Sequence, residues 1–106
     1  MDSLTILAPA FNEEQNIIPF VSHFYEKLEN NWEILIVNDG SNDGTGKVLT
    51  EIKNDYPNLR VISHEFNKGI GKAFETGFKN INTDYVITID ADLSHTFSVV
   101  DELYKN

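Results

Sequence analysis

The stretch WEILIV at residues 32–37, followed directly by NDGSNDG at residues 38–44, indicates the fold most clearly. The first six residues form a nearly continuous apolar run, which is typical of a strand buried on both faces of a sheet. The next seven residues are a dense cluster of turn formers. The first expectation is therefore a parallel sheet whose strands end in polar loops.

Strand-like and helix-like segments alternate on both sides of this stretch. Apolar or β-prone runs predict four strands, at residues 4–8, 32–37, 59–63 and 85–89. Apolar residues at helical spacing predict four helices, at residues 17–28, from the turn cluster to about Pro57, at 71–79 and at 97–104. In the third helix, four residues are expected to face the core: Ala73, Phe74, Gly77 and Phe78.

The alternating order βαβαβαβα predicts an open, doubly wound, mainly parallel α/β sheet with right-handed crossovers. In such sheets ligands bind beyond the carboxyl ends of the strands, where the strand order reverses. Three polar clusters follow predicted strands, at residues 9–14, 38–44 and 90–95. We therefore expect these clusters to converge on one ligand site.

Composition limits the classes of function. The 106 residues predict a single domain. With 17 acidic and 8 basic residues, the net charge of −9 disfavours nucleic acid and anionic membrane as broad partners. The absence of Cys excludes disulfides and thiolate chemistry and fits a cytoplasmic protein. No apolar run approaches a membrane span, and no signal peptide is expected at the start.

The triplet Asp90-Ala91-Asp92 is the candidate metal site. In an extended segment, residues two apart point to the same side, so both carboxylates can converge. Such oxygen ligands suit Mg²⁺ or Mn²⁺, particularly when a substrate phosphate completes the coordination shell. The alternative is a solvated loop whose carboxylates cap a helix, and spacing alone leaves both interpretations open.

Two further carboxylates are candidates with structural alternatives. Asp39 could accept hydrogen bonds from a base or ribose, or it could serve turn chemistry only. Glu13 could line the same site, although Glu near a helix N-terminus is favoured by the helix dipole whatever the function. The Gly69-Ile70-Gly71 turn lacks the last glycine of the dinucleotide fingerprint, because Phe74 stands there. The three histidines are scattered without zinc-site spacing.

Taken together, four segments are more specific than any one of them. In this order and spacing they resemble the family 2 glycosyltransferases of the GT-A fold, and most closely the branch of dolichyl-phosphate mannose synthase and polyprenyl-phosphate glycosyltransferases. The segments are APAFNEE at 8–14, IVNDGSNDGT at 36–45, NKGIGKA at 67–73 and IDADLSH at 89–95.

The resemblance implies inverting transfer of a sugar from a GDP- or UDP-sugar with Mg²⁺ or Mn²⁺, and it offers a polyprenyl or dolichyl phosphate as a candidate acceptor. It also implies the site residues by position. Asp90 and Asp92 would hold the metal, and the nucleotide site would comprise Pro9, Phe11, Glu13, Val37, Asp39, Asp90, Ala91 and Asp92.

The chain also departs from the family. Asn38 stands where many relatives have Asp, and Ser94 stands where bacterial relatives often have Gln. Family catalytic domains are about twice as long, so residues 1–106 are expected to be the nucleotide-sugar-binding half without the acceptor half, either a fragment or a short gene product. The catalytic residues are then unknown and the chain alone is expected to be inactive. The alternative function is a non-catalytic module that self-associates through an exposed sheet edge.

Overall fold

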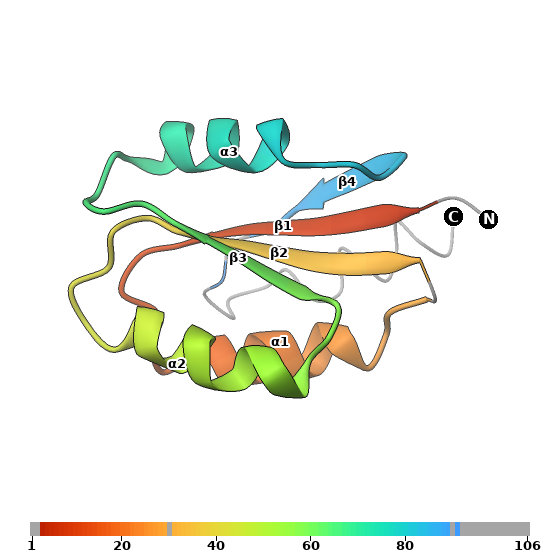
Figure 1. The fold of residues 1–106 in the computed structure, drawn as a ribbon, viewed down its shortest axis with the longest axis horizontal. Helices are drawn as coiled ribbons and strands as arrows, with labels where there is room; N and C mark the ends of the chain where they lie inside the picture. Colours follow the sequence, from red (N-terminus) through yellow and green to blue (C-terminus); the bar gives the residue numbers. More distant parts are fainter. Residues whose placement is uncertain (1–2, 30, 90, 92–106) are drawn as a thin grey trace.

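The computed structural model describes residues 3–29, 31–89 and 91. They form one four-stranded, fully parallel sheet with the strand order β3-β2-β1-β4 (Figure 1). In chain order the elements are β1 (Leu4–Ala10), α1 (Ile17–Tyr25), β2 (Trp32–Asn38), α2 (Thr45–Ile52), the short 3₁₀ helix η1 (Lys53–Asp55), β3 (Leu59–Ser63), α3 (Ile70–Lys79) and β4 (Tyr85–Thr88).

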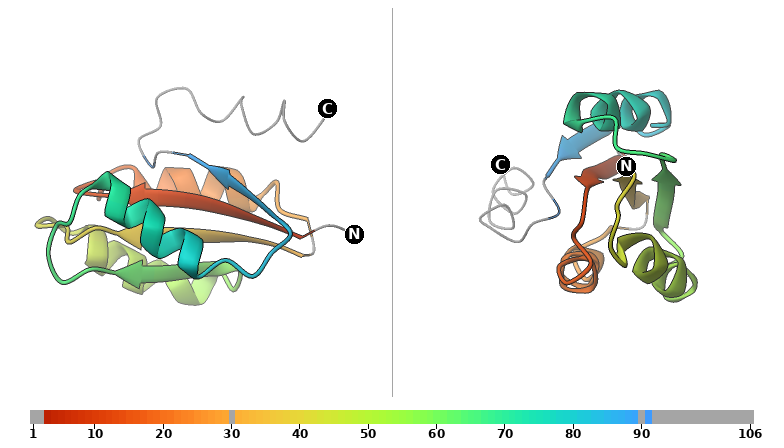
Figure 2. Two further views of the ribbon diagram at one scale, coloured as in Figure 1. Left: turned by 90° about the horizontal axis from the view of Figure 1, so that it is seen from above. Right: turned by 90° about the vertical axis from the view of Figure 1, so that its left-hand side faces the viewer.

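The helices cover the two faces of the sheet unequally. In Figure 1, α1 and α2 lie below the sheet and α3 lies above it, and the end-on view in Figure 2 shows the same three layers. This arrangement confirms the predicted doubly wound α/β architecture. The predicted fourth helix, at residues 97–104, falls outside the described residues.

Strand β2 is buried on both faces, as its apolar run predicted. Ile34 and Ile36 belong to the core on the side of α1 and α2, whereas Leu35 and Val37 belong to the core on the side of α3. All four side chains are fully buried. The period-2 alternation of a strand thus explains why a continuous apolar run was needed here.

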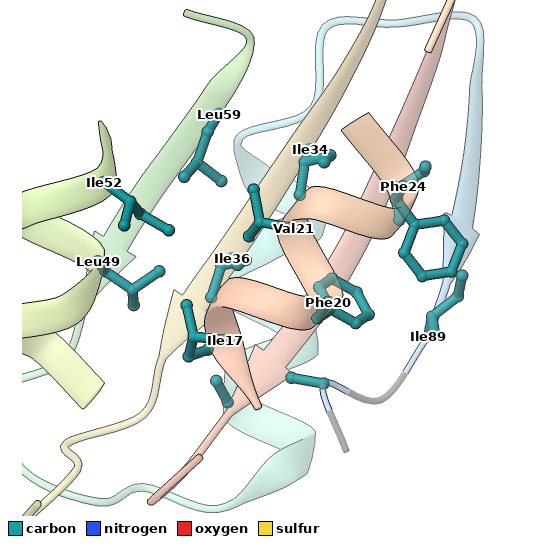
Figure 3. Packing of buried hydrophobic residues seen from close by; sticks show 14 of the residues in the cluster. Ile17, Phe20, Val21, Phe24, Ile34, Ile36, Leu49, Ile52, Leu59 and Ile89 are labelled. Carbon is teal, nitrogen blue, oxygen red and sulfur yellow. The ribbon is translucent and has the colours of Figure 1, made fainter. Parts of the chain in front are cut away.

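The larger core lies between the sheet and the helices α1 and α2. Figure 3 shows side chains of α1 pointing onto β2, with α2 and β3 closing the cluster from the other side. The rings of Phe20 and Phe24 pack at 4.9 Å between centroids. The labelled members are Ile17, Phe20, Val21, Phe24, Ile34, Ile36, Leu49, Ile52, Leu59 and Ile89.

The smaller core, under α3, depends on a close helix–sheet approach. Ala73 and Gly77 are buried against the sheet, as expected. Phe78, which was predicted to face inward, is 51% exposed, and its ring stacks on the half-buried Phe74. The inward prediction was wrong for Phe78 because the narrow contact is made by small residues, which leaves no room for another ring.

Gly77→Ala is expected to destabilise the fold by about 1–2 kcal/mol. A Cβ at Gly77 would collide with the buried side chain of Leu7, and the cost exceeds the helix-propensity gain of about 1 kcal/mol. Gly71→Ala is the matched control in the same helix, because a Cβ there meets nothing within 4 Å. Urea unfolding should show Gly71→Ala neutral or slightly stabilising; equal losses in both variants would contradict the packing argument.

Several predicted element ends differ from the structure, some of them by one residue only. Strand β1 continues through Pro9 to Ala10, although Pro9 was expected to stop it. The nitrogen of Pro9 points toward β4, the same side as the carbonyl of Leu7, which accepts a hydrogen bond from the amide of Ile89. Strand β4 already ends at Thr88, so no residue of that strand lies opposite the Pro9 nitrogen. The missing N–H of Pro9 therefore costs no hydrogen bond between strands.

Two helices also end earlier than predicted. Helix α1 ends at Tyr25 instead of residue 28, and α2 is followed by the 3₁₀ helix η1 before Pro57.

The amino ends of the strands carry a separate polar network. Glu33 accepts hydrogen bonds from the Thr5 hydroxyl at 2.8 Å and from the Arg60 guanidinium at 3.0 Å. The Arg60 guanidinium also donates to the carbonyl of Asn80 at 3.0 Å, which ties the end of α3 to the sheet. Arg60 is thus hydrogen-bonded at the amino ends of the strands, whereas the cavity described below lies at their carboxyl ends.

Candidate functional site

A cavity of about 410 Å³ opens at the carboxyl ends of the strands. All four strands contribute to it through the residues that follow or end them, so it lies at the reversal of strand order between β1 and its neighbours β2 and β4. Its lining residues are Pro9, Ala10, Phe11, Glu13, Asp39, Asn67, Gly69, Ile70, Ala73 and Ala91.

The loops after β1 and β2 are held together by reciprocal hydrogen bonds. The amide of Asn12 donates to the Ser41 hydroxyl at 3.0 Å, and the Asn12 side-chain oxygen accepts the amide of Asn42 at 2.8 Å. The amide of Glu13 donates to the Thr45 hydroxyl at 2.9 Å. Asn12 has a φ of 56°, a conformation that Asn tolerates better than most residues. These bonds fix the side of the cavity that Phe11 and Glu13 line.

Asn38, the departure noted in the sequence, has a local structural role. Its buried side-chain oxygen accepts the Ser41 hydroxyl at 2.6 Å and the Ser41 amide at 3.3 Å. The amide group thereby closes the turn that follows β2. It lies outside the cavity lining, so the site has one carboxylate at this strand end instead of a pair.

Asp39 organises the opposite wall of the cavity. Its carboxylate is 5% exposed and accepts four hydrogen bonds, two on each oxygen. Oδ1 lies 2.7 Å from His64 Nδ1 and 3.0 Å from the amide nitrogen of Lys68. Oδ2 lies 3.0 Å from Asn67 Nδ2 and 2.9 Å from the amide nitrogen of Gly69. One carboxylate therefore holds the loop that joins β3 to α3.

The pKa of the Asp39 carboxyl lies below its ordinary value. Burial alone would raise that pKa, but the hydrogen bonds from His64 and from the amides of Lys68 and Gly69 stabilise the charged form more strongly. Asp39 is consequently ionised at neutral pH, and its charge is already shared among donors from the protein.

Gly40 allows the two loops to touch. It has a φ of +67°, and a Cβ on it would collide with the backbone of Phe66 and Asn67. Only glycine meets both the conformational and the steric demand. Direct backbone contact between residues 40 and 66–67 brings the donors at residues 67–69, in the loop between β3 and α3, within reach of the Asp39 carboxylate.

Five of the eight predicted site residues line the cavity: Pro9, Phe11, Glu13, Asp39 and Ala91. Val37 does not, since its side chain is buried in the core under α3. Asp90 and Asp92 fall outside the described residues. Ala91, which lies between them in the sequence, is 1% exposed. Among the residues that the structure describes, no group of three or more His, Asp or Glu could hold a metal ion.

Sequence reasoning missed His64 and Asn67 as parts of the site wall. His64 follows β3 directly, and Asn38 pairs with Ser63 in the parallel register of β2 and β3. The next positions along both strands are Asp39 and His64, and the register that brings them together is not visible in either stretch of sequence. Asn67 lines the cavity and binds Asp39 through its side-chain amide.

A parallel α/β sheet with a cavity at its topological reversal defines the class of doubly wound α/β proteins, which bind their ligands at this place. A family model narrows this class. The glycosyl transferase family 2 model matches residues 5–106, and the chain belongs to that family.

The chain is about one-third identical to curated relatives over the aligned residues. It is 35% identical over 109 aligned residues to dolichyl-phosphate β-glucosyltransferase of Saccharomyces cerevisiae, an alignment covering 94% of the chain and 33% of that protein. It is 33% identical over 103 residues to dolichol-phosphate mannosyltransferase of Pyrococcus furiosus, covering 96% of the chain and 29% of that protein. The chain thus spans about a third of the length of these relatives.

Solved structures share the fold. Mannosyltransferase PcManGT from Pyrobaculum calidifontis, in complex with GDP-Man and Mn²⁺, superposes with a TM-score of 0.77 at 24% identity, over 84% of the chain and 27% of that structure. S. aureus TarS in complex with UDP-GlcNAc superposes with a TM-score of 0.78 at 23% identity, over 96% of the chain and 30% of that structure. These likenesses confirm the GT-A type of fold. No helix in the described part of the chain is long and apolar enough to cross a membrane.

Proposed function

We propose that this chain binds the nucleotide of a GDP- or UDP-sugar together with Mg²⁺ or Mn²⁺, and that it forms the donor-binding part of an inverting glycosyltransferase. The proposed acceptor is a lipid phosphate such as a polyprenyl or dolichyl phosphate. An acceptor of this kind is already anionic at neutral pH and has little need of a strong general base. The cytoplasmic location stays a prediction.

The observation that carries this proposal is the position of the cavity. It gathers Pro9, Phe11, Glu13, Asp39 and Ala91, which come from three separate sequence segments and were all expected at a nucleotide site. Phe11 is 41% exposed and offers a ring face to a base. Because the Asp39 carboxylate already accepts four hydrogen bonds, we propose that it serves the nucleotide mainly by holding the cavity wall in shape.

The proposed metal ligands are the carboxylates of Asp90 and Asp92. Their support is the donor chemistry, together with the position of their neighbour in sequence, Ala91, which lines the cavity. A divalent cation bound there would neutralise the leaving diphosphate. It would also add positive charge at the carboxyl ends of the strands, away from Arg60, whose guanidinium binds Glu33 and the carbonyl of Asn80 at the amino ends.

The central test is a titration with GDP, UDP and ADP, with and without Mn²⁺ or Mg²⁺, followed by backbone amide shifts. We expect the shifts to cluster at residues 9–13, 37–40 and 89–92 and to depend on the metal. Asp92→Asn should weaken the metal-dependent affinity at least about tenfold, since even residues supporting a metal ligand typically contribute that much. The midpoint of urea unfolding should stay unchanged.

Asp55→Asn is the matched control, because it removes one exposed carboxylate in η1 on another part of the molecule. It should bind nucleotide like the unmodified chain. Absence of any nucleotide-induced shift at millimolar concentration would contradict the proposal. A large fall in the unfolding midpoint of Asp92→Asn would instead assign Asp92 a structural role.

A non-catalytic pairing module is the second candidate function, and the position of β4 at the edge of the described sheet favours it. Among the described strands β4 pairs with β1 alone, and Tyr85 and Val86 are 56% and 37% exposed. Exposed sheet edges promote association with a second strand. A chain that sediments as a dimer and binds none of the three nucleotides would favour this candidate over the first.

A further inference from the structure

His64 connects Asp39 in the wall of the cavity to helix α3. Its ring is 8% exposed and lies between two polar partners from different elements. Nδ1 lies 2.7 Å from Asp39 Oδ1, and Nε2 lies 2.8 Å from the hydroxyl of Thr76 in α3. The amide of His64 also donates to the carbonyl of Asn38 at 2.9 Å, which fixes the backbone next to the ring.

The partners of Asp39 determine which ring nitrogen carries a proton. Backbone amides are obligatory donors, so Oδ1 accepts from Lys68 and Oδ2 accepts from Gly69. A carboxylate in this position can only accept a further bond, and therefore His64 Nδ1 must be the donor. In the neutral ring Nε2 is then an acceptor, and the Thr76 hydroxyl supplies the proton of the second bond.

The position of Asp39 matters because it acts on the backbone of the cavity wall. The amides of Lys68 and Gly69 lie at the start of the segment that turns into α3, and Gly69 itself lines the cavity. Gly69 has a φ of +98°. A Cβ on Gly69 would meet no atom of the described residues within 4 Å, so none of their side chains or backbone packs against this side of the residue. The hydrogen bonds to the carboxylate thus supply the restraint that packing does not.

We propose that His64 is a positioning residue of the nucleotide cavity: its Nδ1–H, oriented from behind by Thr76, holds the Asp39 carboxylate in the geometry that fixes residues 67–69. The role in nucleotide affinity rests on the function proposed above. The role in loop geometry does not, and it can be measured without any nucleotide.

Two variants of His64 separate the two ring nitrogens. Asn places its side-chain NH₂ where Nδ1 stands, so His64→Asn keeps a donor toward Asp39 and gives up the link to Thr76. Gln reaches the place of Nε2, so His64→Gln keeps a polar group near Thr76 and gives up the donor toward Asp39. Both variants replace a buried ring by an amide. A loss of packing alone would therefore affect them similarly.

The first readout is the amide hydrogen exchange of Lys68 and Gly69 in the chain without nucleotide. We expect exchange at both amides to be at least about tenfold faster in His64→Gln, because a hydrogen bond to a charged group contributes that much to an equilibrium. In His64→Asn, exchange should stay within about threefold of the unmodified chain. GDP and UDP titrations in the presence of Mn²⁺ should rank the affinities in the same order.

The second readout needs no variant to fold. Long-range ¹H–¹⁵N spectra of the imidazole rings in the unmodified chain report which nitrogen is protonated, and through-bond correlation to the assigned Cβ of His64 identifies its ring signal. A protonated Nδ1 supports the proposal, and a neutral ring protonated only on Nε2 overturns it. Equal exchange and equal affinity in the two variants would overturn it as well. If no nucleotide binds the unmodified chain, the proposed function fails, whereas the exchange data still decide the role of His64.

Discussion

Gly40→Ala is expected to lose about 3 kcal/mol or more of unfolding free energy and, with it, most of the nucleotide affinity. Two costs act together at this position. A φ of +67° costs a residue with a Cβ about 1–2 kcal/mol. The new Cβ would also collide with the backbone of Phe66 and Asn67, which cannot turn aside as a side chain can. The loop between β3 and α3 would have to move away from Asp39, which would break its hydrogen bonds to the carboxylate.

Gly69→Ala is the control that isolates the conformational cost. Gly69 also has a positive φ, of +98°, but a Cβ there meets nothing within 4 Å. Urea unfolding should therefore show a loss of about 1–3 kcal/mol for Gly69→Ala, whose φ of 98° and ψ of 158° form a conformation almost restricted to glycine, and a larger loss for Gly40→Ala. Equal losses would mean that the contact between residues 40 and 66–67 contributes nothing to stability.

Asp39→Asn is the second large expected effect, a loss of about 2–4 kcal/mol. The carboxylate accepts two hydrogen bonds on each oxygen, and three of the four donors come from the 67–69 loop. In an amide, one of these oxygens becomes an NH₂ group, which would face the fixed amide N–H of Lys68 in one orientation and that of Gly69 in the other. We expect urea unfolding at lower concentration and loss of amide protection at Lys68 and Gly69. Asp55→Asn, at an exposed site, should change neither.

The acid dependence of stability provides a separate check on Asp39. Because the folded-state pKa lies below the ordinary value of 3.8, the stabilisation from Asp39 is complete above that value and is lost as pH falls through the folded-state pKa. The difference in unfolding free energy between the unmodified chain and Asp39→Asn should therefore shrink below about pH 4. A difference that stays constant from pH 7 to pH 3 would contradict this account of Asp39.

The elements that the sequence predicted well are those whose pattern is local. The apolar run at residues 32–37 required burial on both faces, and a parallel sheet with helices on both sides follows from it. The polar clusters at the strand ends predicted the cavity, because the carboxyl ends of parallel strands meet at one edge. For the same reason Pro9, Phe11 and Asp39 could be assigned to one site from their positions along the chain.

The parts that could not be predicted depend on distances between segments. The pairing of His64 with Asp39 and Thr76 needs the register of β2 against β3 and the docking of α3, which no single stretch of sequence contains. Phe78 was predicted to face the core because helical spacing identifies the apolar face of α3. The spacing does not tell how many residues of that face contact the sheet. The width of this contact is set by Gly77 against Leu7.

The sheet order has a consequence for how the protein acquires its structure during synthesis. Strand β1 leaves the ribosome first, yet its Leu4 pairs with Tyr85 of β4, which emerges long after β2 is complete. At the usual rate of about 5 to 20 residues per second, one edge of β1 waits roughly 4 to 16 s for its partner. During that interval the nascent chain presents an open apolar edge, and its most vulnerable moment falls before translation reaches the end of β4.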